Sequence, residues 1–174
     1  CVSRNISQQK IAETRLKEAI KRDELTGLYN RSTFYKTFKQ VLLKAQQQQT
    51  KAGLLLIDLD YFRHINDTLG HIAGDHLLHV LGQRFQACFG PNTIVARLGG
   101  DEFVMLSVEN DKTGAETLLD RLIAAFAEAN IGAAIGLAMR HPSQGLFAAL
   151  AQADQNMFEY KRWKKASEAV AYLK

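Results

Sequence analysis

The stretch RLGGDEFVML, residues 97–106, places two glycines and two acidic residues between two apolar segments. Such a pattern predicts a β-hairpin, because glycine readily adopts the positive φ of tight turns. Gly99 and Gly100 would also let a phosphate group approach the backbone closely. Asp101 and Glu102 are therefore either solvated turn residues or members of a site, and the other acidic residues of the chain bear on that choice.

A second acidic pair ends the apolar segment 52–60, AGLLLIDLD, which is typical of a strand buried on both faces. Strand alternation turns Asp58 and Asp60 to one face, with the Leu59 carbonyl between them. Carboxylates there are costly unless they are paired or bind a metal, although Asp60 alone could cap the next helix. Because Mg²⁺ accepts carboxylates, carbonyls and substrate phosphates, Asp58 and Asp101 would bind it together if the hairpin lies beside this strand.

In the segment 66–75, NDTLGHIAGD, Gly70 and Gly74 are expected to break the helix, which leaves Asn66 and Asp75 at the edges of a loop. An aspartate accepts hydrogen bonds from the N1–H and N2 amino groups of guanine, and an asparagine donates to O6 or N7. Adenine cannot satisfy that carboxylate, so the pair would select GTP over ATP. Taken alone, Asp75 is better explained as an N-cap for a helix over 75–88.

The helix expected over 147–163 has an apolar stripe that contains one acidic residue, Asp154. We expect this carboxylate to be buried and hydrogen-bonded, with a structural role. Lys161 and Lys165 follow on the same face. They predict either a solvated basic face or a phosphate-binding pair.

The bulk composition narrows the class of protein. A chain of 174 residues with 47% hydrophobic and 23% charged residues fits one globular domain. No apolar run approaches a membrane span, and no basic stretch interleaved with aromatics suggests nucleic acid, so we expect neither membrane contact nor nucleic-acid binding from this segment. The two cysteines form no disulfide or metal pattern, which favours the cytoplasm. Because the first residue is Cys1, we expect a piece of a longer protein, whose other parts include any membrane anchor.

The periodicity of apolar residues along the chain predicts the helices and strands that must position these residues. Residues 5–23 predict a helix with a narrow apolar stripe, either packed on its own domain or forming a coiled-coil stalk from an upstream domain. A second helix precedes the strand 52–60, and helices over 62–69 and 75–88 follow it. A hairpin, a helix, a strand over 131–139, the helix 147–163 and a last strand over 168–173 complete an α/β sandwich with a mixed sheet.

Four motifs, in order, resemble the GGDEF family of diguanylate cyclases. They are DELTGLYNR (23–31), DLDYFRHINDTLGHIAGD (58–75), RLGGDEF (97–103) and ADQNMFEYK (153–161). The resemblance implies an α+β domain over 23–174 with a ferredoxin-like, palm-type sheet surrounded by helices. Residues 1–22 would be a linker or signalling helix, similar to the exit from a PAS-like sensor.

Members of this family join two GTP into cyclic di-GMP with release of pyrophosphate. The resemblance implies that two Mg²⁺ (or Mn²⁺) ions are held by Asp58, the Leu59 carbonyl and Asp101. It implies that Asp101, Glu102 and Arg63 are catalytic, with Glu102 orienting or deprotonating the ribose 3′-OH. Each chain carries half a site, so activity would need a homodimer.

The resemblance also implies the substrate contacts. The residues concerned are Asn66 and Asp75 at guanine, and Phe62, Arg63, Gly99, Gly100, Lys161 and Lys165 around the triphosphate. Arg63 replaces the usual lysine, and Lys165 stands where an arginine is usual, without the GRN-like turn that follows it. Positions 90–93 read GPNT, so the RxxD product-inhibition site is absent.

Two other functions stay open at this point. One is a GTP-binding regulatory module that makes little product and controls an attached domain, such as an EAL phosphodiesterase. The other is a cyclase that closes one nucleotide to cyclic GMP. The intact GGDEF signature favours the diguanylate cyclase, whereas the altered segment 161–165 leaves room for the regulatory module.

Overall fold

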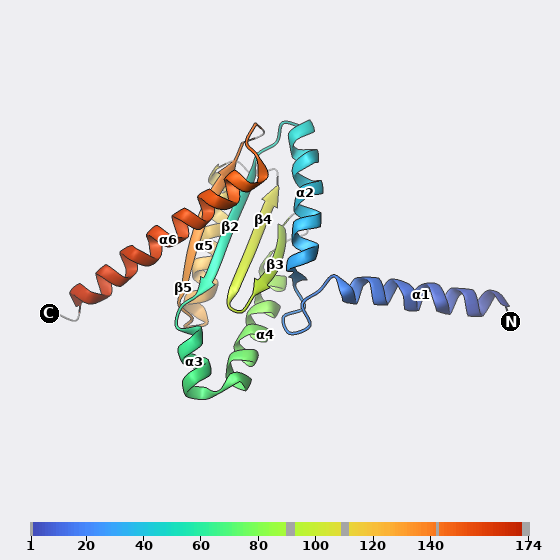
Figure 1. Ribbon diagram of the computed structural model, residues 1–174, viewed down its shortest axis with the longest axis horizontal. Coiled ribbons are helices and arrows are strands. Elements are labelled where there is room, and N and C mark those ends of the chain that lie inside the picture. The colour runs from blue at the N-terminus through green and yellow to red at the C-terminus, as the bar shows by residue number, and fades with distance from the viewer. Residues whose placement is uncertain (1, 90–92, 109–111, 142, 172–174) are drawn as a thin grey trace.

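A computed structural model describes residues 2–89, 93–108, 112–141 and 143–171. Its centre is a five-stranded sheet in the order β1-β3-β4-β2-β5 (Figure 1). The strands are β1 Tyr29–Asn30, β2 Ala52–Leu59, β3 Thr93–Gly99, β4 Glu102–Val108 and β5 Ala133–Arg140. The helices are α1 Val2–Ile20, α2 Arg31–Gln47, α3 Phe62–Leu69, α4 His71–Cys88, α5 Lys112–Glu128 and α6 Leu146–Ala171.

The strand pairing is that of a ferredoxin-like sheet. β2 lies between β4 and β5 and is antiparallel to both, and β3 is antiparallel to β4. From β2 to β5 the chain therefore runs strand, helices, strand, strand, helix, strand. The short β1 pairs in parallel with β3, which makes the sheet mixed. The predicted fold class is confirmed.

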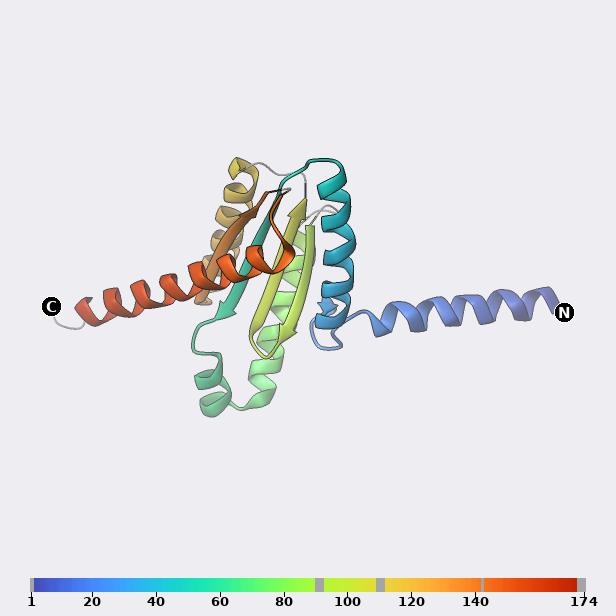
Figure 2. The ribbon, with the colours of Figure 1, turned by 45° about the horizontal axis from the view of Figure 1, so that its top comes forward.

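Helices cover both faces of the sheet, as Figure 2 shows. On one face, α4 and α5 bury Leu78, Phe85 and Leu122 against the inward side chains of β2 and β4. On the other face, α2 and α6 pack Phe34 and Ala153 against the alternate side chains of the same strands. The continuous apolar run of β2 follows from this arrangement, because both faces of a central strand are covered.

Small residues bring α6 close to β5. The side of β5 that faces α6 carries Ala134, Gly136 and Ala138, all of them buried. A Cβ at Gly136 would lie 2.0 Å from the Ala153 carbonyl oxygen and 2.6 Å from the Met157 amide nitrogen. The missing side chain thus lets the backbone of α6 rest on the sheet, and α6 runs diagonally across this face and beyond its edge (Figure 1).

α1 extends away from the sheet in both views (Figures 1 and 2). Every residue from 8 to 22 is exposed, including Ile11, Leu16 and Ile20 of the apolar stripe. The predicted helix is confirmed, but the alternative that packs it on its own domain is wrong. A coiled-coil stalk stays a prediction, consistent with an apolar stripe that this chain leaves uncovered.

The end of the chain differs from the prediction. Residues 168–171, expected to be a strand, continue α6 to Ala171, and residues 172–173 lie outside the described part of the chain. The segment has β-propensity, yet the helix needs no strand partner and its alanines favour continuation. Within the described residues, no helix is both long enough and apolar enough to cross a membrane.

Candidate functional site

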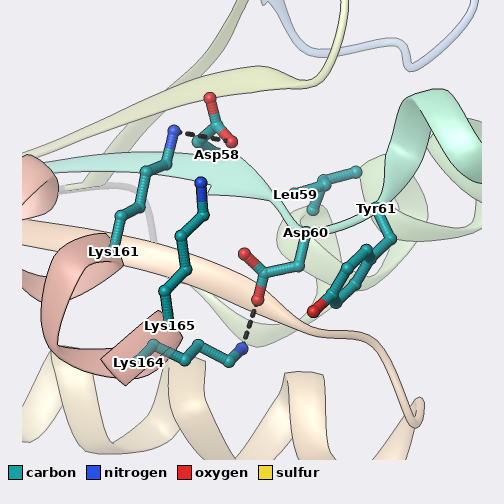
Figure 3. A pocket seen from close by; sticks show the side chains of 7 residues that line it. All are labelled: Asp58, Leu59, Asp60, Tyr61, Lys161, Lys164 and Lys165. Atoms are coloured by element: carbon teal, nitrogen blue, oxygen red, sulfur yellow. Dashed lines mark hydrogen bonds and ion pairs between the residues drawn. The ribbon is translucent and has the colours of Figure 1, made fainter. Parts of the chain in front are cut away.

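A pocket of about 300 Å³ opens where β2 ends. The strand end and the following turn supply Asp58, Leu59, Asp60 and Tyr61, and α6 supplies the lysines. Figure 3 shows Lys161, Lys164 and Lys165 reaching from one side of α6 toward the two aspartates. The sequence placed these groups about a hundred positions apart, and the close approach of α6 to the sheet brings them together.

Two ion pairs join α6 to this strand end. Lys161 Nζ lies 3.0 Å from Asp58 Oδ1, and Lys164 Nζ pairs with Asp60 Oδ2 (Figure 3). Asp60 therefore does not cap the next helix, whose N-cap residue is Tyr61. Lys164 was not predicted as a site residue, because no local pattern links it to an aspartate on another element. Carboxylates and ammonium groups side by side suit a ligand that brings both phosphates and cations.

The hairpin tip lies against the same strand end. Leu59 N donates a hydrogen bond to the Asp101 carbonyl oxygen at 3.2 Å, and Asp58 lies directly opposite Glu102 in the β2–β4 register. Burial and the nearby negative charge of Asp58 raise the pKa of Asp101, although its own backbone hydrogen bond and the charges of Lys161 and Arg97 oppose this. The negative charges of Asp58 and Asp101 repel each other, and a cation bound between them would offset this repulsion.

The donors present fit a metal that the substrate helps to hold. Among the described residues, no group of three or more His, Cys, Asp and Glu side chains has the geometry of a metal centre. What the site offers is the Asp58 and Asp101 carboxylates with the Leu59 carbonyl. Mg²⁺ commonly takes one or two protein carboxylates plus phosphate oxygens, so this donor set is adequate once a triphosphate is present.

Glu102 faces a second, smaller pocket of about 180 Å³ beside the first. This pocket is also lined by Arg31 and Tyr35 of α2 and by Asp154 of α6. Asp154 is exposed, so the expected buried, structural carboxylate is wrong. α6 instead buries a stripe made of Ala149, Ala153 and Met157. Asp154 follows Ala153 directly and lies outside this stripe. Arg31 and Asp154 thus lie near Glu102, which the sequence pattern did not reveal.

The helical hairpin of α3 and α4 brings Asn66 next to the start of α4. A Cβ on Gly74 would lie only 1.9 Å from Asn66 Oδ1, so glycine makes room for this amide. Asp75 follows Gly74 directly and is exposed. The N-cap of α4 is Gly70, and Gly74 lies inside the helix, so the predictions of a break at Gly74 and of Asp75 as N-cap are wrong. Asp75 is therefore not needed to begin the helix.

The remaining predicted residues fall into different environments. Phe62 is buried in the core, so only its backbone can face a ligand. Arg63 is exposed on the first turn of α3 and is not among the residues that line the β2 pocket. Gly99 and Gly100 are exposed at the hairpin tip with φ of 148° and 50°, and both lack any neighbour that a Cβ would meet. These angles explain the glycines without any ligand.

A brace connects the hairpin tip to the loop after α1. Arg97 Nη1 lies 3.2 Å from both carboxylate oxygens of Asp23, and Arg97 Nε donates to the Gly100 carbonyl at 2.9 Å. Asp23 Oδ1 also accepts hydrogen bonds from the backbone and hydroxyl of Thr26. Burial alone would raise the pKa of Asp23, but the hydrogen bonds from Thr26 and the charge of Arg97 outweigh it and lower the pKa.

Asp23→Asn is expected to lower the free energy of unfolding by about 1–3 kcal/mol at pH 7, the order for hydrogen bonds to a charged group. A lowered pKa in the folded state means that the stabilisation is present above the unfolded-state pKa and disappears as the pH falls through the folded-state pKa. Urea unfolding at pH 7 and at successively lower pH should show the two proteins converging in acid. Glu24→Gln, at the exposed neighbouring position, is the matched control. Equal stability of Asp23→Asn and parent at pH 7 would contradict the brace.

Residues 20–167 match the family model described as diguanylate cyclase, GGDEF domain. The chain belongs to the GGDEF-domain family. The match begins at the end of α1 and includes every site residue discussed above.

Similar proteins include a diguanylate cyclase and a cyclic di-GMP phosphodiesterase. The chain is 30% identical over 167 residues to the diguanylate cyclase DgcM of Escherichia coli K12, covering 92% of this chain and 41% of that protein. It is 33% identical over 123 residues to the cyclic di-GMP phosphodiesterase PdeB of Shewanella oneidensis, covering 71% of this chain and 14% of that protein. The chain thus spans less than half the length of either relative.

Solved structures support the fold. A sensory box/GGDEF family protein from Caulobacter crescentus is 30% identical, with a TM-score of 0.73 over 82% of this chain and 98% of that one. The coiled coil and GGDEF domain of DgcB from the same organism gives a TM-score of 0.84 over 92% of this chain and 91% of that one. At 21% identity, the second likeness concerns the fold alone.

Proposed function

We propose that this GGDEF domain is a diguanylate cyclase, which condenses two GTP into cyclic di-GMP and releases pyrophosphate. The observation that carries the proposal is the meeting of Asp58 and Asp101 with Lys161 and Lys165 at the end of β2. Acidic groups that can share a cation with a triphosphate, beside lysines that can bind the same phosphates, are what phosphoryl-transfer chemistry requires.

Each residue then has a role that its position supports. Asp58, Asp101 and the Leu59 carbonyl would hold Mg²⁺ or Mn²⁺, which supplies charge neutralisation and activates the attacking hydroxyl. Lys161, now paired with Asp58, and Lys165 bind the triphosphate oxygens. Glu102 accepts the proton of the ribose 3′-OH as that oxygen attacks the α-phosphorus of the other GTP and pyrophosphate leaves.

The nucleotide is oriented from the α3–α4 hairpin. Asn66 and Asp75 read the guanine edge, and the open Gly99–Gly100 tip lets phosphates approach the backbone. One chain provides one such half-site, so the reaction joins nucleotides held by two chains across a two-fold axis. The exposed apolar stripe of α1 is the natural element to hold the pair, with an upstream sensor setting its geometry.

A direct assay tests the proposal. The chain is fused through α1 to a constitutive dimerising coiled coil, incubated with GTP and Mg²⁺, and the products are identified by mass. Cyclic di-GMP and pyrophosphate in a 1:2 ratio are expected. Cyclic GMP as the product, or no turnover by a dimer that binds GTP, would overturn the proposal.

The alternative function is a regulatory GTP-binding module that controls an attached domain such as an EAL phosphodiesterase. The likeness to a region of PdeB favours it, as does the loss of the usual residues after Lys161. GTP binding without turnover in the same assay would select this function.

Asp75→Ala is expected to weaken GTP binding by about ten- to a hundredfold, the order for a hydrogen-bonded charged group. Because Gly70 rather than Asp75 caps α4, the helix should remain intact and the far-ultraviolet circular dichroism should not change. Titration calorimetry in the presence of Mg²⁺, with a GTP analogue that lacks the ribose 3′-hydroxyl and so cannot react, measures the effect. Asp67→Ala, an exposed aspartate of the same hairpin, should bind GTP as the parent does. Unchanged affinity of Asp75→Ala would place base recognition elsewhere.

The absence of primary product inhibition stays a prediction from the sequence. Gly90, Pro91 and Asn92 lie outside the described residues, and Thr93 begins β3. None of these side chains supplies a charge for the phosphates or a carboxylate for guanine.

A further inference from the structure

Arg140 is a buried arginine at the end of the sheet opposite the candidate site. It ends β5 and pairs with Ala52, the first residue of β2, whereas the β2 pocket lies at the other end of these strands. Arg140 is only 4% exposed. Within the described part of the chain, its Nε and Nη1 atoms have no hydrogen-bond partner. Burial lowers the pKa of its guanidinium. Buried guanidinium N–H groups that have no partner are costly, and an anion bound beside them would offset that cost.

Arg140 lines a pocket of about 350 Å³ between the end of α2 and the beginning of α6. Lys39 and Gln46 of α2 and Gln144 of the preceding loop also line it, and none of its lining residues is acidic. The pocket therefore presents two cationic side chains and several hydrogen-bond donors. It lacks any carboxylate that would repel an anion.

The first turn of α6 adds to the positive electrostatic potential of this pocket. Gly145 and Phe147 line the pocket on either side of the first residue of this 26-residue helix. The first turn of α6 contains no acidic residue that would neutralise the positive end of the helix dipole. Backbone N–H groups at such a terminus favour anions. The helix end, the buried guanidinium and the lysine thus converge on one cavity.

An apolar wall accompanies these polar groups. Leu43 is 53% exposed and Phe147 is 74% exposed, and both line the pocket. An exposed aromatic ring beside a cationic pocket can stack on a planar base while the cations bind phosphate.

We propose that this pocket is a second ligand site, which binds the phosphate groups of a phosphorylated small molecule through Arg140 and Lys39. The phosphates lie beside the Arg140 guanidinium where it lines the pocket, and their negative charge offsets the cost of burying that cation. Phe147 contacts the remainder of the ligand where that remainder is a base. The site lies at the far end of β5 from Asp58 and does not depend on the proposed cyclase activity.

Titration calorimetry in EDTA tests the proposal with two probes, inorganic pyrophosphate and GMP. Arg140→Gln and Lys39→Ala are each expected to weaken binding of pyrophosphate by about tenfold or more. Lys39 is exposed on α2, so Lys39→Ala reports on the site even if Arg140→Gln fails to fold. Lys36→Ala, one turn earlier on α2 and outside the pocket lining, is the matched control and should bind as the parent does.

Two further variants distinguish this site from the candidate active site, and a nucleotide ligand from a simple phosphate. Lys161→Ala should leave pyrophosphate binding at the Arg140 pocket unchanged, because that lysine lies at the other end of the sheet. If the ligand is a nucleotide, Phe147→Ala should weaken binding of GMP and leave binding of pyrophosphate intact. If the ligand is a simple phosphate, Phe147→Ala should change the binding of neither probe. Both results support the phosphate site. Pyrophosphate affinity that is the same in the parent, Lys39→Ala and any folded Arg140→Gln protein, or absence of binding to the parent, would overturn the proposal.

Discussion

An Asp101→Asn protein is expected to fold, to bind GTP and to form cyclic di-GMP about a thousandfold more slowly than the parent. The carboxylate at the hairpin tip is one of two that would hold the cation, and an amide binds Mg²⁺ poorly. Loss of a metal ligand removes several kcal/mol of transition-state stabilisation, about the order of this rate change. Product formation by the dimerised chain, followed by chromatography at saturating GTP and Mg²⁺, measures the effect.

The same substitution should not destabilise the fold. Burial and the negative charge of Asp58 raise the pKa of Asp101, so its ionised form is unfavourable in the folded state. Stability contributed by this group therefore falls as the pH rises through the unfolded-state pKa toward the folded-state pKa, and at pH 7 the charge is a cost. We expect Asp101→Asn to unfold at the same temperature as the parent or higher. Asp67→Asn controls for the loss of an exposed charge, and a folded Asp101→Asn dimer with parental turnover would exclude Asp101 from the reaction.

Much of the sheet was predictable because its patterns are local. Residues 54–57 form a continuous apolar run, which is typical of a strand covered on both faces. Gly99 and Gly100 separate two apolar segments and adopt the positive φ that the hairpin requires. The positions of β2, β3 and β4 followed from these signals, and the ferredoxin-like pairing followed from the family resemblance.

Where the prediction failed, long-range packing had overridden a local signal. Gly74 was interpreted as a helix break, but glycine is required there by the Asn66 amide that lies against it. Asp154 was placed in the buried stripe of α6, yet the close approach of α6 to Gly136 rotates the buried face to Ala153 and Met157. Neither contact leaves a periodicity in the sequence, because each depends on how two elements cross.

The lysines of the β2 pocket also show that contacts between distant elements leave no local pattern in the sequence. Lys161 and Lys165 were predicted from the motif, whereas Lys164 was not, although its ion pair with Asp60 makes it part of the same pocket. One alternative for Asp60 was a helix cap, which is a local role. Its actual partner lies 104 positions away, and only the three-dimensional crossing of α6 over β2 reveals it.

Gly136→Ala is expected to lower the free energy of unfolding by about 2–4 kcal/mol, among the largest effects of any single methyl group in this chain. The new Cβ would lie 2.0 Å from the Ala153 carbonyl oxygen and 2.6 Å from the Met157 amide nitrogen, which are backbone atoms and cannot rotate away. α6 must therefore move off β5, and overpacking of this kind costs more where the neighbour is backbone. Urea unfolding followed by circular dichroism measures the difference.

This substitution also tests whether α6 positions the site. Lys161 and Lys164 reach Asp58 and Asp60 only because α6 lies close to the sheet. A displaced helix should weaken GTP binding in protein that is still folded, as measured by calorimetry at low temperature. Gly145→Ala is the matched control, because a Cβ there meets nothing within 4 Å and its φ is not positive, so it should unfold as the parent does. If Gly136→Ala were as stable as Gly145→Ala, α6 would not rest on the sheet through this glycine, and the placement of the lysines would need another cause.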